Sequence, residues 1–65
     1  LSELETALAG KPDERLRRIA LAALIAQAGD ARGWSPERLA RLRAYREDPS
    51  PLVAGAAQFT LPPEE

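Results

Sequence analysis

The sequence has no cysteine, histidine or methionine among its 65 residues. Without cysteine and histidine, the chain has no disulfide bonds, no thiolate metal sites and no histidine-based zinc or catalytic sites. We therefore expect neither a metal nor a cofactor. Because methionine is absent and the chain begins with Leu1, we expect it to be a processed piece or an excised domain of a longer protein.

Residues with β-branched aliphatic side chains are also scarce. Valine and isoleucine total three, whereas alanine (13) and leucine (10) make up over a third of the chain. Strong helix formers dominate, so the composition predicts an all-α fold. The net charge of −1 comes from nine basic and ten acidic side chains. This balance disfavours duplex nucleic acid or an anionic membrane as the main partner.

No long hydrophobic run is present. The longest mostly apolar run covers residues 19–28, well short of the roughly 20 residues that span a bilayer. No charged-then-apolar leader opens the chain, and by default we expect a cytoplasmic protein that does not contact the membrane. Eight of the nine basic residues are arginine, a bias typical of GC-rich genomes, and we expect a bacterial source.

Helix start and stop signals predict a single helical domain over residues 1–61, followed by a solvated tail at 62–65. Ser2 and Glu5 match a Ser-x-x-Glu capping box at the start of the first helix. Ser-Pro pairs at 35–36 and 50–51 place a capping serine and a first-turn proline before the third and fourth helices. The four predicted helices cover residues 3–9, 13–28, 36–46 and 51–60.

The second predicted helix is apolar on nearly every side. One stripe contains Ile19, Ala23 and Leu24, but Leu21 and Ile25 make the opposite side apolar as well. A helix that is apolar all round is a buried helix, so we expect residues 19–28 to lie in the centre, covered on both flanks.

The last two helices are expected to face the core with their large side chains. These side chains are Leu39, Leu42 and Tyr45 in the third helix, and Leu52, Val53, Ala56 and Phe59 in the fourth. Trp34 and Leu39 occupy the two positions of a hydrophobic staple, which gives Trp34 a structural role.

An internal repeat relates the two halves of the chain. Residues 11–24 align with residues 48–61 at an offset of 37, which pairs Pro12 with Pro49 and Leu24 with Leu61. This offset suits a two-helix repeat unit. The sequence therefore predicts four helices arranged as two stacked antiparallel helical hairpins, with repeat one at 1–29 and repeat two at 34–61.

The second copy resembles the second helix of HEAT-type repeats. That family pattern has an Asp-Pro turn, a Val-Arg pair, an alanine pair and a terminal leucine. The residues that fit it are Asp48, Pro49, Pro51, Val53, Ala56, Ala57 and Leu61. Ala54 stands where the family usually has arginine, while in the first copy Leu16-Arg17 fits the Val-Arg pair and Lys11 replaces the aspartate.

The resemblance implies a non-catalytic module that binds a protein or packs against adjacent repeats. In such repeats an aspartate–arginine ladder joins neighbouring units, so we expect Arg17 and Asp48 to pair within about 6 Å, beyond which no direct bond forms. Second helices line the concave binding face of the family. The candidate partner-binding residues are Arg17, Arg18, Leu21, Ile25, Ala54 and Gln58.

Catalytic candidates are few, because an enzyme here would depend on carboxylates, hydroxyls, Lys11 or Tyr45. The serines stand at helix starts, where capping is their ordinary role. We expect no catalysis. The residues expected to be structural are Ser35, Pro36, Asp48, Ser50, Pro51 and Trp34.

Two alternatives remain open from the sequence. Residues 33–40 look like the opening of a helix-turn-helix unit, and arginines cluster at 15–18 and 38–46, so nucleic-acid binding is one alternative. Residues 1–9 resemble the short leucine- and glutamate-rich helix of docking domains in multienzyme assemblies, so a dimerising docking domain is the other.

Overall fold

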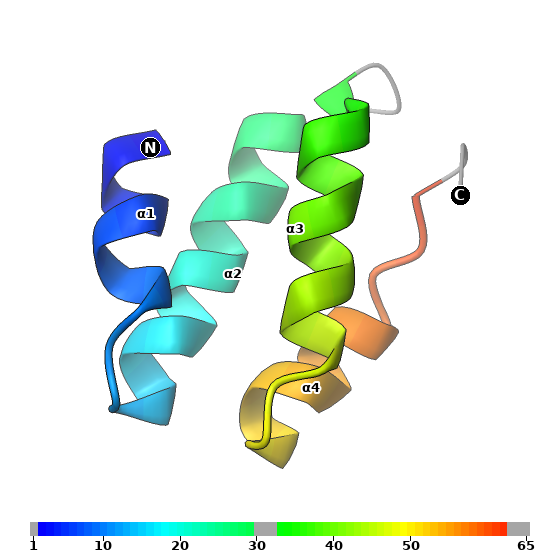
Figure 1. Cartoon of the computed structure of the whole chain (residues 1–65). Coiled ribbons are helices and arrows are strands. Elements are labelled where there is room, and N and C mark those ends of the chain that lie inside the picture. The colour runs from blue at the N-terminus through cyan, green and yellow to red at the C-terminus, as the bar shows by residue number, and fades with distance from the viewer. Residues whose placement is uncertain (1, 30–32, 63–65) are drawn as a thin grey trace.

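The computed structural model describes residues 2–29 and 33–62, and the chain forms four helices there. They are α1 (Ser2–Ala9), α2 (Glu14–Ala28), α3 (Pro36–Arg46) and α4 (Pro51–Gln58) (Figure 1). The all-α prediction is confirmed. The predicted bounds agree within one residue at α1, α2 and α3, whereas α4 ends two residues earlier than predicted.

The predicted serine caps of the third and fourth helices are confirmed. Ser35 and Ser50 are the N-caps of α3 and α4, and their hydroxyl oxygens accept hydrogen bonds from the backbone N–H groups of Arg38 and Leu52. Asp13 caps α2 in the same way. Gly29 ends α2 with φ at 61°, a conformation that side chains with a Cβ rarely adopt.

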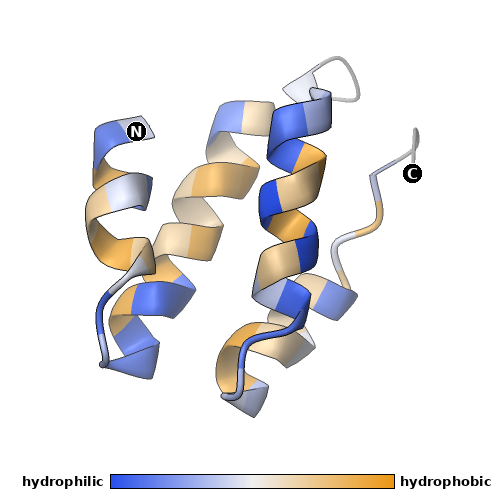
Figure 2. Cartoon of the chain, in the orientation of Figure 1, coloured by the Kyte–Doolittle hydropathy of each residue, from blue (hydrophilic) through white to orange (hydrophobic). Residues whose placement is uncertain are grey.

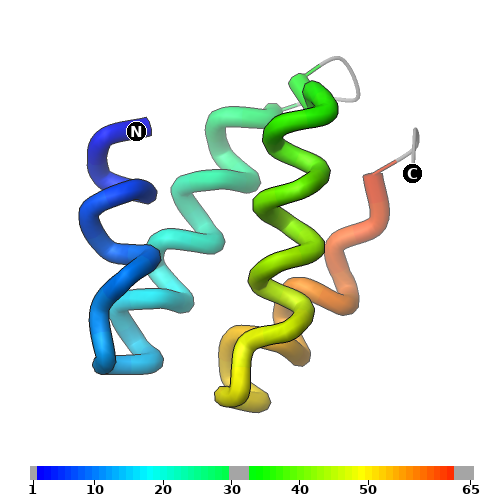
Figure 3. The backbone as a smooth tube through the Cα atoms, viewed as in Figure 1, coloured from blue at the N-terminus to red at the C-terminus, as the bar shows by residue number. Residues whose placement is uncertain are grey.

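Helix α2 contacts all three other helices, and its contact with α1 is the most extensive. The chain runs down α1 and back up α2, crosses to α3, runs down that helix, and then turns into α4, which lies beside α2 (Figure 3). The backbones of α1 and α3 do not contact each other within the described residues. Only side chains join these two helices.

The core is built from small and aliphatic side chains where α2, α3 and α4 meet. Its members are Ala20, Leu21, Leu24, Leu42, Tyr45, Val53 and Ala57. Trp34, Leu8 and Ile25 are half-buried and pack against this cluster, so Trp34 lies where a structural role requires it. In Figure 2 the hydrophilic residues lie along α3 and at the start of α2, while the rest of α2 and most of α4 are apolar or neutral.

The prediction that α2 is covered on both flanks is wrong. Ile19 is 48% exposed, and Ala22 and Ala26 are exposed as well. These residues lie at i, i+3 and i+7, so they form one continuous open stripe along the helix. The apolar pattern was correct, but it does not distinguish a surface covered by this chain from one left open.

Helix α4 also differs from the predicted burial. Val53 is buried as expected, whereas Leu52 is 45% exposed and Phe59, just beyond the end of the helix, is 90% exposed. The aligned leucines of the two repeat copies differ too: Leu24 is fully buried and Leu61 is 76% exposed. The sequence repeat is therefore not matched by equal burial.

The predicted solvated tail at 62–65 can be compared with the structure only at Pro62. Pro62 is buried rather than solvated. Residues 63–65 lie outside the described residues.

Candidate interaction surface

A buried polar cluster joins α1 to α3. Glu5 is 1% exposed, and Tyr45 donates a 2.6 Å hydrogen bond from its hydroxyl to Glu5 Oε2. Arg41 forms an ion pair with Glu5 Oε1 and donates to Thr6 Oγ1 at 3.3 Å. The capping-box prediction for Glu5 is wrong, because its carboxylate pairs with α3 instead of bonding back to the start of α1.

Burial and the hydrogen bond to the Glu5 carboxylate raise the pKa of Tyr45 well above its usual range. The phenol therefore keeps its proton and acts as a donor to Glu5. A hollow of about 280 Å³ opens beside this cluster and also reaches Asp48. Its two carboxylates, Glu5 and Asp48, are each already paired with an arginine, an arrangement typical of structural clusters.

A second polar cluster forms where α2 begins. Arg17 donates to both carboxylate oxygens of Asp48, from Nε at 2.8 Å and from Nη2 at 3.0 Å. Its Nη1 donates to the backbone carbonyls of Lys11 at 3.0 Å and Pro12 at 2.7 Å. The predicted Arg17–Asp48 pair is confirmed. The hydrogen bonds from Arg17 hold the pKa of Asp48 below its usual value.

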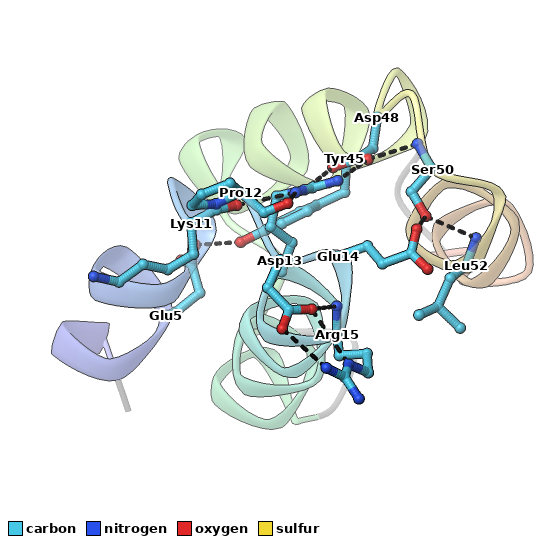
Figure 4. A network of polar contacts seen from close by, with 11 residues as sticks. Glu5, Lys11, Pro12, Asp13, Glu14, Arg15, Tyr45, Asp48, Ser50 and Leu52 are labelled. Carbon is cyan, nitrogen blue, oxygen red and sulfur yellow. Dashed lines mark hydrogen bonds and ion pairs between the residues drawn. The ribbon is translucent and has the colours of Figure 1, made fainter.

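Ser50 extends this cluster to α4. Its hydroxyl donates to Glu14 Oε2 at 2.6 Å and accepts from the Leu52 N–H at 3.2 Å, while Asp48 Oδ1 accepts from the Ser50 N–H at 2.9 Å. The starts of α2 and α4 are therefore joined directly (Figure 4). We call Glu14, Arg17, Asp48 and Ser50 the polar corner.

Most of the arginines that suggested nucleic-acid binding have partners within the chain. Arg15 pairs with Asp13 at 3.3 Å, and Arg38 donates to the Gly33 carbonyl at 2.8 Å. Arg46 donates to two carbonyls at the end of α4, at 3.3 and 2.7 Å. These arginines bind backbone carbonyls and a nearby carboxylate, so fewer guanidinium groups are left to contact phosphates.

Three helices contribute exposed hydrophobic side chains to one side of the molecule. Leu4, Ile19 and Leu52 come from α1, α2 and α4 and are between 45% and 48% exposed. In Figure 4, Leu52 and Arg15 point to the side opposite Tyr45 of α3. Ile19 follows Arg15 by four positions and lies on the same helical stripe, so it faces the same side as Leu52.

Helical rotation places Leu4 on this side as well. Thr6 faces Arg41 of α3, and residues two positions apart differ by about 200° around a helix, so Leu4 points away from α3. Phe59 follows Leu52 by seven positions, which continues the same stripe of α4. We call this surface the rear face, since it lies opposite α3, the helix in front in Figure 1. It consists of Leu4, Ile19, Ala22, Ala26, Leu52 and Phe59.

The residues that the sequence nominated for partner binding do not form one surface. Leu21 is fully buried in the core, so its nomination is wrong, and the Arg17 side chain is engaged in the polar corner. Arg18 and Ile25 are half-buried and border the rear face on α2. Ala54 and Gln58 lie on α4, turned by about 200° and 120° from Leu52, and so face elsewhere.

The rear face was missed because its members were assigned to the core. Ile19, Leu52 and Phe59 are apolar and lie in helical stripes, which is the ordinary pattern of core residues. The available signal was the second helix itself, because its apolar surface is larger than three shorter helices can cover.

Two further features of the described residues bear on function. Among residues 2–29 and 33–62, no group of three or more acidic side chains is placed to hold a metal ion. No helix in that part of the chain has the length and hydrophobicity that crossing a bilayer requires.

Comparison of the chain with protein-family models, with curated proteins and with solved structures gives no significant match.

Proposed function

We propose that this chain is a non-catalytic protein-interaction module that binds its partner through the rear face. The observation that carries this proposal is that Leu4, Ile19 and Leu52 come from three helices, are each about half exposed, and face the side of the molecule opposite α3. Single exposed hydrophobic residues are ordinary on soluble proteins, but several that face one side of the molecule from three helices are typical of a binding surface.

The physical basis is the free energy of burying apolar surface, about 25 cal/mol per Å². Ala22 and Ala26 in the middle of the rear face have small side chains, so a partner helix can approach α2 closely. The borders of the face carry Arg15 and Arg18, which suit the polar rim of an interface.

As part of this proposal, α1–α2 and α3–α4 are two hairpins stacked in the manner of HEAT-like repeats. Two observations support it: α2 packs against α4, and the Arg17–Asp48 pair joins one hairpin to the other. The unequal burial of Leu24 and Leu61 counts against a close repeat. Stacked repeats need cover on each apolar flank, so the proposal requires a partner over the open stripe of α2.

Site-specific photo-crosslinking tests the proposed function. A photoreactive amino acid replaces Ala22 on the rear face or, as a matched control, Ala40, an exposed alanine of α3 on the opposite side. The experiment is done in cells that make the chain natively. We expect light-dependent protein adducts from position 22 and few from position 40. Nucleic-acid adducts, or equal protein adducts from both positions, would contradict the proposal.

A further inference from the structure

We infer that the partner on the rear face is a second copy of this chain, with the α2 helices of the two copies packed antiparallel about a two-fold axis near Ala22. This inference rests on the proposed function, because it assumes that the rear face is an interaction surface. It adds the identity of the partner and the orientation of the contact.

The position of the open stripe favours a helix as the partner element. Ala22 lies close to the middle of α2, which spans Glu14–Ala28, and the exposed alanines leave room for axes only about 8 Å apart. An antiparallel pairing centred on Ala22 overlaps nearly the full length of both helices. It also places Ile19 of one copy opposite Ile25 of the other, so both aliphatic side chains gain cover.

The charges along α2 make the stripe complementary to itself in that orientation. Arg15 and Arg18 lie near the start of the helix, and no basic residue lies in its last turn. The end of a helix carries a partial negative charge, which a basic side chain stabilises. A two-fold antiparallel pairing brings Arg18 of one copy beside Ala26 of the other, and Arg15 beside Gly29, where the last carbonyls lie.

The free chain leaves Arg18 available for this contact. Arg18 makes no hydrogen bond or ion pair within the part of the chain that the structure describes, whereas Arg15 and Arg17 both pair with aspartates. A parallel pairing would instead place the arginines of the two copies side by side, where their positive charges repel each other. The charge pattern therefore selects the antiparallel arrangement over the parallel one.

The available surface is also sufficient for a stable contact. A standard interface takes about 800 Å² from each partner. The chain exposes 4148 Å², so such an interface would use about a fifth of its surface. The face draws on three of the four helices, with Leu4 and Leu52 flanking the central α2 contact.

Sedimentation equilibrium of the purified chain tests the inference. We expect twice the 7.1 kDa chain mass for the wild type, a single chain mass for Ala22→Glu, and twice the chain mass again for Ala40→Glu. Both substitutions introduce the same charge at an exposed helical alanine, and circular dichroism verifies that both variants keep their helix content. A wild type that stays monomeric up to about 1 mM, where only very weak association escapes detection, would overturn the inference. A dimeric Ala22→Glu would overturn it as well.

Cysteine crosslinking tests the orientation, and the absence of native cysteine makes each introduced thiol unique. Under oxidation, Ala22→Cys is expected to form covalent dimers rapidly, because the two copies meet near the axis. In Arg15→Cys the two thiols stand about 21 Å apart along antiparallel helices, beyond the roughly 7 Å that a disulfide spans. Equal crosslinking of both variants would contradict the antiparallel arrangement.

The two proposals fail in different ways. If position 22 forms adducts only with a different protein, the rear face is still an interaction surface but the second copy is not its partner. If position 22 forms no protein adduct at all, the proposed function fails together with this inference.

Discussion

The two flanks of α2 carry similar side chains in opposite surroundings. On the closed flank, Leu21 and Leu24 are fully buried by the rest of the chain. On the open flank, Ile19 is half exposed beside the exposed Ala22. The difference does not come from residue type, since all four are aliphatic. It comes from the number of neighbouring helices, because three helices cannot surround a fourth completely when each is short.

The polar groups of α2 show the same asymmetry. Arg17, on the closed side, has four hydrogen bonds that join the start of α2 to the preceding loop and to Asp48. Arg18, its neighbour in sequence, is turned toward the open side and has no such partner within the described residues. The closed flank is therefore covered by the chain itself, whereas the apolar and charged groups of the open flank stay uncovered within the described residues.

The largest expected effect comes from truncating one side chain on each flank. Leu24→Ala leaves a cavity in the core and should lower the free energy of unfolding by about 3 kcal/mol. Ile19→Ala removes a half-exposed side chain and should cost only about 1 kcal/mol in the monomer. Urea unfolding at low chain concentration measures both. Equal losses would mean that the two flanks are equally buried, contrary to the structure.

The next largest effect tests the buried polar contact between α1 and α3. Tyr45→Phe removes the donor to Glu5 Oε2 and should cost about 2 kcal/mol, because hydrogen bonds to charged groups are strong and the carboxylate remains buried. In a Glu5→Gln background the same substitution should cost less, since no charge is left unsatisfied. Equal costs in both backgrounds, measured by urea unfolding, would show that the hydroxyl does not stabilise the Glu5 carboxylate.

These contacts differ in how much of them the sequence predicts. The caps Ser35 and Ser50 and the terminal Gly29 follow from local rules, because each acts on backbone groups within a few residues. The Glu5–Tyr45 contact was not predicted, because it joins residues 40 positions apart and a competing local motif offered Glu5 a role at the start of α1. Long-range polar contacts depend on how helices pack, and helical periodicity does not determine that.

The Arg17–Asp48 pair is the exception, since it was predicted although it spans 31 positions. The prediction used the resemblance to repeats whose neighbouring units share such a pair, which supplied the missing information about packing. The assignment of Leu52 and Phe59 to the core used periodicity alone and was wrong. Periodicity identifies which side chains share a stripe, but not whether this chain or another molecule covers that stripe.

The acid stability of the chain should reflect the polar corner. The pKa of Asp48 is lowered in the folded state, first by its hydrogen bond to Arg17. The stabilisation is therefore present above the unfolded value of about 3.9 and is lost as the pH falls through the lower folded value. Urea unfolding as a function of pH should show a weaker acid dependence for Asp48→Asn than for the wild type.

A matched variant separates this effect from general charge loss. The pKa of Asp13 is also lowered, by its hydrogen bonds to Arg15, but the Asp13–Arg15 pair is largely exposed and solvent screens it. Asp13→Asn should therefore change the acid dependence less than Asp48→Asn does. A larger change for Asp13→Asn would mean that the helix cap, and not the polar corner, dominates acid stability.

The smallest expected effect concerns Gly55 of α4. Gly55 lies inside the helix, and a Cβ added there meets no atom within 4 Å. Gly55→Ala should therefore raise the free energy of unfolding by about 0.5–1 kcal/mol, because glycine loses more conformational freedom in a helix than alanine does.

Gly55 is turned by about 60° from Leu52 and by 100° from Ala54, away from the core-facing Val53. If the two copies meet through α2 on the rear face, sedimentation equilibrium of Gly55→Ala should give the same mass as the wild type. A variant that is more stable but no longer associates would move the interface from α2 to the outer surface of α4.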